Sequence, residues 1–409
     1  MCDCASDCVS KAAPPKPPLI GEIFRRYGRQ YVRRHPVTRE QWLAVEHIAR
    51  CRTEAMGANL RSCSHCGHSE LHYNSCGDRH CPRCQWLVRA GWIVRRQARA
   101  LPVPNFLVTF TVPEALRAIA QSNPEAVFAL MFQAASRTLI ELGAERLGTL
   151  GFTIVLHTWS RQLIFHPHLH AVVAAGGLAG DCWTSTRPDF LFPVARVRAL
   201  FRKQMLQGLH RLYDEGALDL TGELASLSDP VVFGAVVRKL WETEWIVDIQ
   251  PPQGKPEHAV KYLAAYTRSV AISEHRMVSL SDDGVVTFKT RGPKRVTLAA
   301  AAFIRRFLLH VLPSGLHKTR HYGLYANGSR ARLEQARQIL AASQPCFATE
   351  PPEPDAATAL AAATTWQDRV TLLTGNDPRV CPRCGRDGMI LATLALRPPL
   401  RGHAPEDTS

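Results

Sequence analysis

Closely spaced cysteines constrain the N-terminal part of this 409-residue chain most strongly. Cys63 and Cys66 form one C-x-x-C pair, and Cys81 and Cys84 form a second. Structural zinc takes four ligands in a tetrahedron, and each such pair can supply two thiolates. The segment between the pairs has a suitable length for a ribbon hairpin. The spacing predicts one closed, structural Zn²⁺ site made of these four thiolates; free thiols in a loop are the alternative.

Other cysteines leave the ligand set open. Cys51, Cys76 and His80 lie close enough in sequence to form a second site or to replace one ligand. The C-terminal C-x-x-C at 381–384 cannot close a zinc site with two thiolates alone. It needs partners, such as Cys346, a histidine or another chain, or it is not a metal site.

The charge of the chain favours a polyanionic partner. The formal net charge is +15 and the pI is about 9.5, which point to nucleic acid first. No apolar run approaches the roughly 18 residues that span a bilayer, and the N-terminus lacks the apolar core of a signal peptide. We therefore expect a cytoplasmic, nucleoid-associated protein that uses neither a membrane nor a small-molecule substrate.

A basic helix is predicted directly after the cysteine module. Arg95, Arg96 and Arg99 can neutralise phosphates, and Trp86 and Trp92 can stack on exposed bases. The alternative is an amphipathic helix whose tryptophans are core residues and whose arginines are solvated.

Beyond residue 100, strand-like runs alternate with helical segments, which predicts an α+β fold. β-Branched and aromatic runs predict strands at 105–113, 151–159, 166–177 and 244–252. Apolar periodicity predicts helices at 114–147, 194–215, 230–243, 256–271, 296–311 and 328–342. An Asp-Gly pair predicts a hairpin over 276–290. A Pro-, Ala- and Glu-rich stretch after 343 predicts a linker.

Two histidines on the third predicted strand are candidate metal ligands. His168 and His170 are two residues apart, so a strand places both imidazoles on one face. Two imidazoles make half of a metal site. The third protein ligand stays open among four candidates: His157, Gln162, Glu257 and His258.

Two tyrosines on the predicted helix at 256–271 are candidate nucleophiles. Tyr262 and Tyr266 share a face at i,i+4, a spacing that alone is more typical of a core stripe. A phenol can attack a phosphodiester and hold the broken strand as phosphotyrosine, and a nearby metal would stabilise the developing charge. Lys261 and Arg268 flank the pair and can lower the phenol pKa or hold phosphate. No G-x4-G-K-[ST] phosphate loop occurs, so no ATPase is expected.

In their order along the chain and in their residues, these motifs resemble those of the two-tyrosine HUH transposases of the insertion sequence 91 family. The resemblance runs from about residue 20 to 342 and includes the C-terminal C-x-x-C. Its carriers are YNSCGDRHCPRCQ, HTWSRQLIFHPHLH, YLAAYTRSVAIS and HYGLYANGSR. It implies an HUH endonuclease core, with the histidines on a central strand of an antiparallel sheet and the nucleophiles on a facing helix. It also implies Mg²⁺ or Mn²⁺ at His168 and His170, and nucleophilic roles for Tyr262 and Tyr266.

We therefore expect a transposase that nicks and rejoins single-stranded DNA, at the element ends and target, through phosphotyrosine in rolling-circle-type transposition. A host helicase is a candidate partner. The alternatives are a replication initiator or relaxase-like HUH nickase, and a non-catalytic zinc-containing DNA-binding protein. The expected organisation is a flexible tail, a zinc-ribbon-like DNA-contact module, the HUH core, a linker, and a knuckle with a disordered tail, at 1–18, 19–100, 101–342, 343–375 and 376–409.

Overall fold

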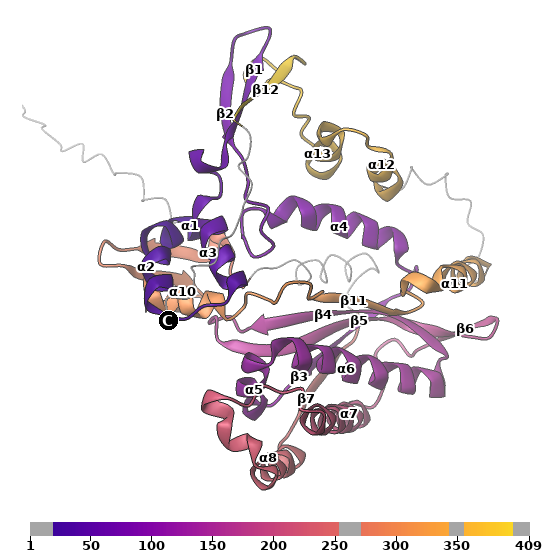
Figure 1. The fold of residues 1–409 in the computed structure, drawn as a ribbon. Helices are drawn as coiled ribbons and strands as arrows, with labels where there is room; N and C mark the ends of the chain where they lie inside the picture. Colours follow the sequence, from indigo (N-terminus) through magenta and orange to yellow (C-terminus); the bar gives the residue numbers. More distant parts are fainter. Residues whose placement is uncertain (1–18, 253–270, 343–355, 396–409) are drawn as a thin grey trace, which may run out of the picture.

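The computed structural model describes residues 19–252, 271–342 and 356–395 (Figure 1). The predicted helix at 256–271 falls almost wholly outside these ranges. The candidate residues outside the described part are Glu257, His258, Lys261, Tyr262, Tyr266, Arg268 and Cys346.

An antiparallel sheet of six strands forms the centre of the molecule, in the order β11-β4-β5-β3-β7, with β6 also paired to β5. The strands are β3 (Asn105–Thr111), β4 (Thr149–Trp159), β5 (Phe165–Ala179), β6 (Cys182–Ser185), β7 (Ile246–Gln250) and β11 (Thr319–Gly323). The structure has the four strands predicted from β-branched and aromatic runs. The edge strand β11 was not predicted, because its residues TRHYG lack an apolar run.

One face of the sheet carries the main hydrophobic core. It is covered by α6 (Pro124–Arg146) and α7 (Val194–Asp214), while α5 (Arg117–Ser122) and α8 (Pro230–Glu242) complete this side (Figure 1). Alternation along β3 turns Phe106, Val108 and Phe110 toward these helices. The residues between them turn toward the other face of the sheet.

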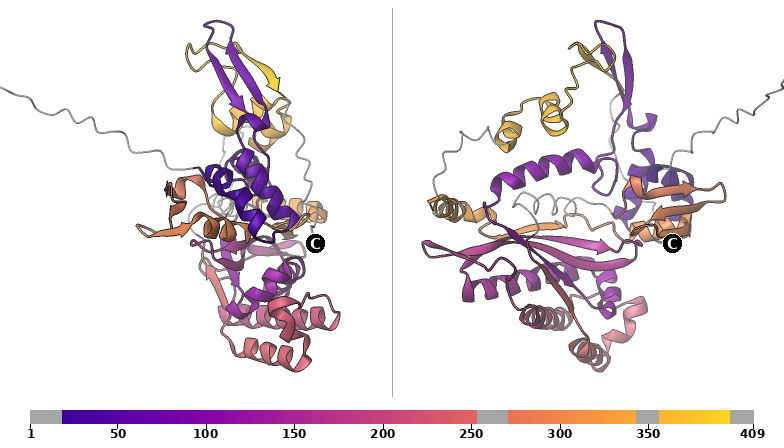
Figure 2. Two further views of the ribbon diagram at one scale, coloured as in Figure 1. Left: turned by 60° about the vertical axis from the view of Figure 1, so that its left-hand side comes forward. Right: turned by 180° about the vertical axis from the view of Figure 1, so that it is seen from behind.

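The other face lies beneath α4 (Gln85–Arg99), the predicted basic helix. Figure 1 and the right-hand view of Figure 2 place α4 across this face. Trp92 packs against a small apolar patch formed by Leu107, Val155 and Val172 of three neighbouring strands. Trp92 is therefore partly a core residue, as the alternative interpretation of this helix expected.

A second core joins segments that are far apart in sequence. On the N-terminal side it contains α1 (Ile20–Ile23), α2 (Arg29–Arg34) and α3 (Arg39–Arg50). On the other side it contains β8 (Met277–Leu280), β9 (Val285–Lys289), β10 (Arg295–Ala299) and α10 (Ala300–Leu308). The predicted hairpin forms as β8 and β9. The helix predicted from residue 296 begins instead at Ala300, because residues 295–299 pair with β9 as a third strand.

A third sheet joins a hairpin of the N-terminal region to a strand of the C-terminal region. Its order is β12-β1-β2, with β1 (Ala58–Cys63), β2 (Ser69–Tyr73) and β12 (Met389–Ala395). The remaining helices are α11 (Arg330–Ala342), α12 (Ala356–Ala362) and α13 (Trp366–Thr374). Helices α12 and α13 form within the stretch predicted as a linker, and both lie against α4 (Figure 1). Among the described helices, none is long and apolar enough to cross a membrane.

Candidate functional site

Three histidines converge on the sheet face beneath α4. His168 and His170 lie on β5, and His157 lies opposite His168 on β4. Their candidate ligand nitrogens all lie within 4.8 Å of one another. Leu169, between the two β5 histidines, is fully buried in the main core on the opposite face. The structure therefore brings the predicted pair together and adds His157, one of the four candidates for the third ligand. Gln162, another candidate, is exposed in the turn between the strands.

Hydrogen bonds and burial prepare these imidazoles to bind a cation. Nδ1 of His168 lies 2.7 Å from the backbone oxygen of His166, so it donates its proton and leaves the Nε2 lone pair available. Nδ1 of His170 lies 3.1 Å from Oγ1 of Thr109. Burial lowers the pKa of His168 to about 4. Burial and then the charge of His168 lower the pKa of His170 to about 3. Both rings are neutral at pH 7, the state in which imidazole binds metal.

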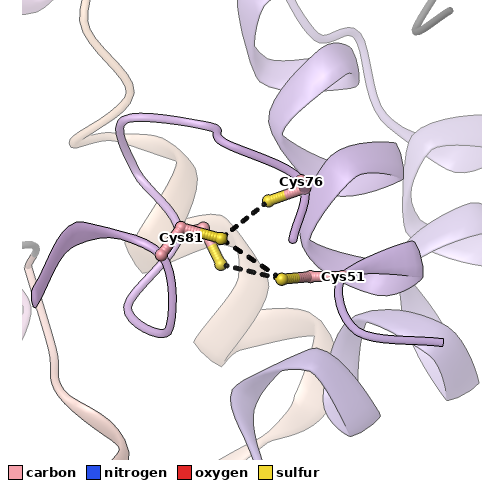
Figure 3. A group of neighbouring side chains, drawn as sticks. Cys51, Cys76 and Cys81 are labelled. Carbon is pink, nitrogen blue, oxygen red and sulfur yellow. Dashed lines mark hydrogen bonds between the residues drawn. The ribbon is translucent and has the colours of Figure 1, made fainter. Parts of the chain in front are cut away.

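A first group of four thiols lies between α3 and α4 (Figure 3). Cys51 follows α3 directly, and Cys84 directly precedes α4. The Sγ–Sγ distances are 3.3 Å for Cys51–Cys84, 3.5 Å for Cys76–Cys84 and 3.6 Å for Cys51–Cys81. A zinc tetrahedron with bonds of about 2.3 Å places sulfurs about 3.8 Å apart, whereas a disulfide holds them about 2 Å apart. The spacing fits a structural zinc site.

A second group of four thiols lies at the tip of the third sheet. Cys63 pairs with Cys384 and Cys66 with Cys381, each at an Sγ–Sγ distance of 3.7 Å. The predicted single site of Cys63, Cys66, Cys81 and Cys84 is therefore wrong in its grouping. The two C-x-x-C pairs belong to different groups, because the β1–β2 hairpin carries the first pair away from the second (Figure 1).

His80 does not join either group of thiols. Its Nδ1 lies 3.2 Å from Oδ1 of Asp78, and its Nε2 accepts the backbone N–H of Leu312 at 3.1 Å. Asp78 also lies 2.9 Å from Nδ1 of His47. Burial alone would raise the pKa of Asp78, but hydrogen bonds from His47 and His80 outweigh it and hold that pKa well below its usual range. Both ring nitrogens of His80 are thus occupied by protein partners.

The preceding residue, Arg79, links this loop to the segment that follows α10. The Arg79 guanidinium donates to three backbone oxygens in the loop after α10, those of Leu312, Pro313 and Leu316, at 2.7, 2.6 and 2.9 Å. Because Cys81 and Cys84 follow at once, this contact positions the first thiol group and the start of α4 against the core.

A cavity of about 290 Å³ lies between this loop, α4 and β11. Its lining is basic and aromatic, and includes Arg79, Trp92, Trp159, His317, Lys318 and His321. Trp159 stacks on His157 with ring centroids 4.6 Å apart, so the cavity adjoins the histidine cluster. The Lys318 ammonium lies 5.9 Å from the Trp159 ring centroid. A second hollow continues along β11 past Arg320 to Asn327. We call the two together the α4–β11 groove.

The three predicted DNA-binding arginines of α4 lie in different surroundings. Arg95 is exposed, Arg99 is half-buried, and Arg96 is only 7% exposed, with its guanidinium 5.2 Å from the Tyr325 ring centroid. Burial and then the charge of Arg99 lower the pKa of Arg96 to about 10. The Nη2 atoms of Arg96 and Arg99 are both buried and have no hydrogen-bond partner among the described residues. The alternative interpretation, in which the arginines of this helix are solvated, therefore does not hold for Arg96, which is turned inward.

Comparisons with known proteins match most of the chain. Residues 23–112 match the model for the transposase zinc-binding domain of the insertion sequence 91 family, and residues 151–332 match a family described as "Putative transposase". The chain is 39% identical to "Putative transposase y4qJ" of Sinorhizobium fredii, over 91% of this chain and 94% of that protein. It is 24% identical to the transposase for insertion sequence element IS801 of Pseudomonas savastanoi pv. phaseolicola, over 77% of this chain and 80% of that protein. No solved structure matches.

The zinc-binding model contains all four thiols of the first group, but only Cys63 and Cys66 of the second. The "Putative transposase" model contains the three clustered histidines and β11. The zinc-binding module, the histidine cluster and the full-length likeness agree: the chain belongs to the insertion sequence 91 family of transposases.

Proposed function

We propose that this transposase nicks and rejoins single-stranded DNA through covalent phosphotyrosine, in rolling-circle-type transposition, with Tyr262 and Tyr266 as nucleophiles. The observation that carries the proposal is the cluster of His157, His168 and His170 on the sheet face opposite the main hydrophobic core. A purely structural histidine cluster would not need three ring nitrogens that converge beside a basic groove. We accordingly assign the sheet to the HUH endonuclease class.

The three imidazoles fit a divalent cation. Their nitrogens converge, burial keeps two of the rings neutral, and the Nδ1 of His168 is held by a backbone oxygen. We propose Mn²⁺ or Mg²⁺ here, completed by a phosphate oxygen of the substrate. When bound, the cation would polarise the scissile phosphate and stabilise its developing charge.

In the proposed cleavage step, the phenolic oxygen of one tyrosine attacks phosphorus. A P–O bond to tyrosine forms while the P–O bond to one sugar oxygen breaks. The phenol gives up its proton, and the departing sugar oxygen takes one to become a hydroxyl. Attack of a sugar hydroxyl on the phosphotyrosine reverses the exchange and rejoins DNA. The number of P–O bonds is conserved, so rejoining needs no ATP, and a second tyrosine permits a second cleavage before the first strand is released.

The α4–β11 groove supports single-stranded DNA as the substrate. Trp159 presents a stacking surface next to His157, and Lys318 supplies a cation beside it. The buried donors of Arg96 and Arg99 lie under α4 with no protein partner in the described chain, and phosphate oxygens would satisfy them. Because the sequence contains no ATP-binding phosphate loop, we propose that a host helicase separates the strands.

Incubation of the full chain with single-stranded DNA from an element end and Mn²⁺ tests the proposal. We expect a covalent protein–DNA adduct on denaturing gels. Either Tyr262→Phe or Tyr266→Phe should reduce adduct formation or rejoining, and the double variant should abolish the adduct. Tyr73→Phe is the matched control, because this tyrosine is exposed on β2 and is not among the residues that line the groove. An adduct that survives loss of both tyrosines would overturn the mechanism.

The same experiment separates the alternatives. A replication initiator or relaxase would cleave its own origin sequence in preference to an element end. A non-catalytic DNA-binding protein would bind the oligonucleotide with Mn²⁺ present and form no adduct. Equal adduct formation on duplex DNA would contradict the single-stranded substrate.

A further inference from the structure

We propose that Cys63, Cys66, Cys381 and Cys384 hold a second structural Zn²⁺, which fastens the C-terminal segment to the N-terminal hairpin. Half of this ligand set lies outside the zinc-binding family model, at the other end of the chain. The inference concerns metal and architecture, and does not depend on the tyrosine chemistry proposed above.

The two knuckles have the same sequence pattern and backbone geometry. Both read C-x-x-C-G, in Cys63–Gly67 and Cys381–Gly385. In each, the N–H of the glycine donates to the carbonyl of the first cysteine, at 3.1 and 2.9 Å. The two glycines have φ of +69° and +70°, a left-handed conformation that favours glycine over other residues. Such matched knuckles present two thiolates each toward a shared centre.

The four sulfurs lie in the arrangement that a zinc tetrahedron needs. The two distances between the knuckles are both 3.7 Å, close to the roughly 3.8 Å expected around one Zn²⁺ and far from a disulfide. All four ligand atoms lie within 4.8 Å of one another. A closed tetrathiolate has no open position, so the site is structural.

Direct contacts between the knuckles show that they form one unit. The Ser64 N–H donates to the backbone oxygen of Gly388 at 3.0 Å, and Nε2 of His65 donates to that of Asp387 at 2.8 Å. Strand β12 then pairs with β1 along its whole length. A side chain at Gly388 would collide with Ser64 and His65, which makes this close approach specific to glycine.

Within the fastened segment, residues 356–395, the helices α12 and α13 lie over the outer side of α4. Leu360 and Leu373, from α12 and α13, both approach Gly91 of α4. The inner side of the same helix carries Trp92 and Arg96 toward the sheet. Helix α4 is thus held between the C-terminal segment and the core (Figure 1, Figure 2). We infer that the second Zn²⁺ stabilises α4 in its place over the groove.

Zinc counting on the purified full chain tests the site, by mass spectrometry of the metal under reducing conditions. We expect Cys381→Ser/Cys384→Ser to lose one equivalent relative to wild type. Cys63→Ser/Cys66→Ser should lose the same one, so that the four changes combined still lose one. Cys182→Ser is the control, because Cys182 is exposed and belongs to neither group.

A second variant keeps the result interpretable if folding is disturbed. Cys51→Ser/Cys81→Ser should lose a different equivalent, so that adding Cys381→Ser/Cys384→Ser to it removes two in total. Retention of the first zinc by the C-terminal variant shows that the N-terminal module is folded. Unchanged zinc in the C-terminal variant, or two equivalents lost by the four combined changes, would overturn the shared site.

The fastening role has its own readout. A protease site inserted between 343 and 355 would separate the C-terminal segment from the core after cleavage. We expect the cut segment to co-elute with the zinc-loaded protein on size exclusion and to be released from Cys381→Ser/Cys384→Ser. Release from the zinc-loaded wild type, or full retention by the variant, would show that zinc does not do the fastening.

Discussion

At the scale of single residues, the histidine cluster depends on the register between two strands. His157 faces His168 because β4 and β5 pair with that register, and an irregularity follows directly before Trp159. A shift of one residue would turn His157 into the main core and bring its neighbour to the open face. The position of His157, the proposed third ligand, is therefore determined by strand pairing and not by a local sequence motif.

We expect His157→Ala to reduce Mn²⁺-dependent cleavage at least about 100-fold, since loss of a ligand weakens the metal that stabilises the transition state. Mn²⁺ should support more activity than Mg²⁺, because imidazole nitrogens suit transition metals better than Mg²⁺. His166→Ala is the matched control: it lies on the same strand face but outside the cluster. The adduct assay and Mn²⁺ titration measure both, and equal effects of the two variants would contradict the assignment.

Replacing Arg96, the inward-facing arginine of α4, should change the affinity for DNA without lowering the stability of the protein. Arg96→Met removes a buried charge whose Nη2 lacks a partner in the described chain, so the melting temperature of the DNA-free protein should not fall. Affinity for single-stranded DNA should fall about tenfold, because a charge-assisted phosphate contact is lost. Arg95→Met, an exposed neighbour, should have the smaller effect on affinity. A destabilised variant with unchanged affinity would make Arg96 purely structural.

At the scale of elements, the loop at 77–80 determines where α4 begins. Asp78 lies between His47 of α3 and His80, and Arg79 binds the loop after α10. Cys81 and Cys84 of the first thiol group directly follow this loop. The first thiol group and this small polar network together position the start of the helix, and neither can be recognised from the sequence of α4 itself.

Asp78→Asn tests this network. The neutral amide cannot pair with two histidines as a carboxylate does, so we expect the free energy of unfolding to fall by about 2 kcal/mol. The zinc content should stay the same, because Asp78 supplies no ligand. Denaturant unfolding and zinc analysis measure the two effects. The exposed Asp282→Asn is the control. Loss of zinc together with stability would mean that the network supports the metal directly.

The sequence predicted helices and strands well where they depend on a local pattern. It predicted them less well where pairing with a distant segment determines the conformation. The apolar runs of β3, β4 and β5 were sufficient to predict strands. Strand β10 reads as part of a helix until β9 pairs with it, and β11 is polar enough to be missed. For the cysteines, spacing alone joined the wrong pairs. The glycine after Cys66 and after Cys384, missing after Cys84, was the available signal for the correct grouping.

At the scale of the whole molecule, the N-terminal module and the transposase core share hydrophobic contacts. Phe24 of the N-terminal helices meets Phe307 of α10 edge to face, with ring centroids 5.1 Å apart. Ile20, Ile23 and Phe24 are fully buried in a core completed by residues 271–308. The boundary expected at residue 100 separates the sequence motifs. It does not separate two hydrophobic cores, because this core contains residues from both sides of it.

We expect the fragment 19–100 not to fold by itself, even with Zn²⁺. Isolation would expose several large apolar side chains, and each costs roughly 1.5–3 kcal/mol when it returns to water. The fragment 19–342, which retains both halves of the shared core, should fold and bind zinc at the first thiol group. Thermal melts by circular dichroism and amide hydrogen exchange compare the two fragments. A cooperative melt with protected amides in 19–100 would show that zinc and local helices suffice, and that the contacts with 271–308 only dock a module already formed.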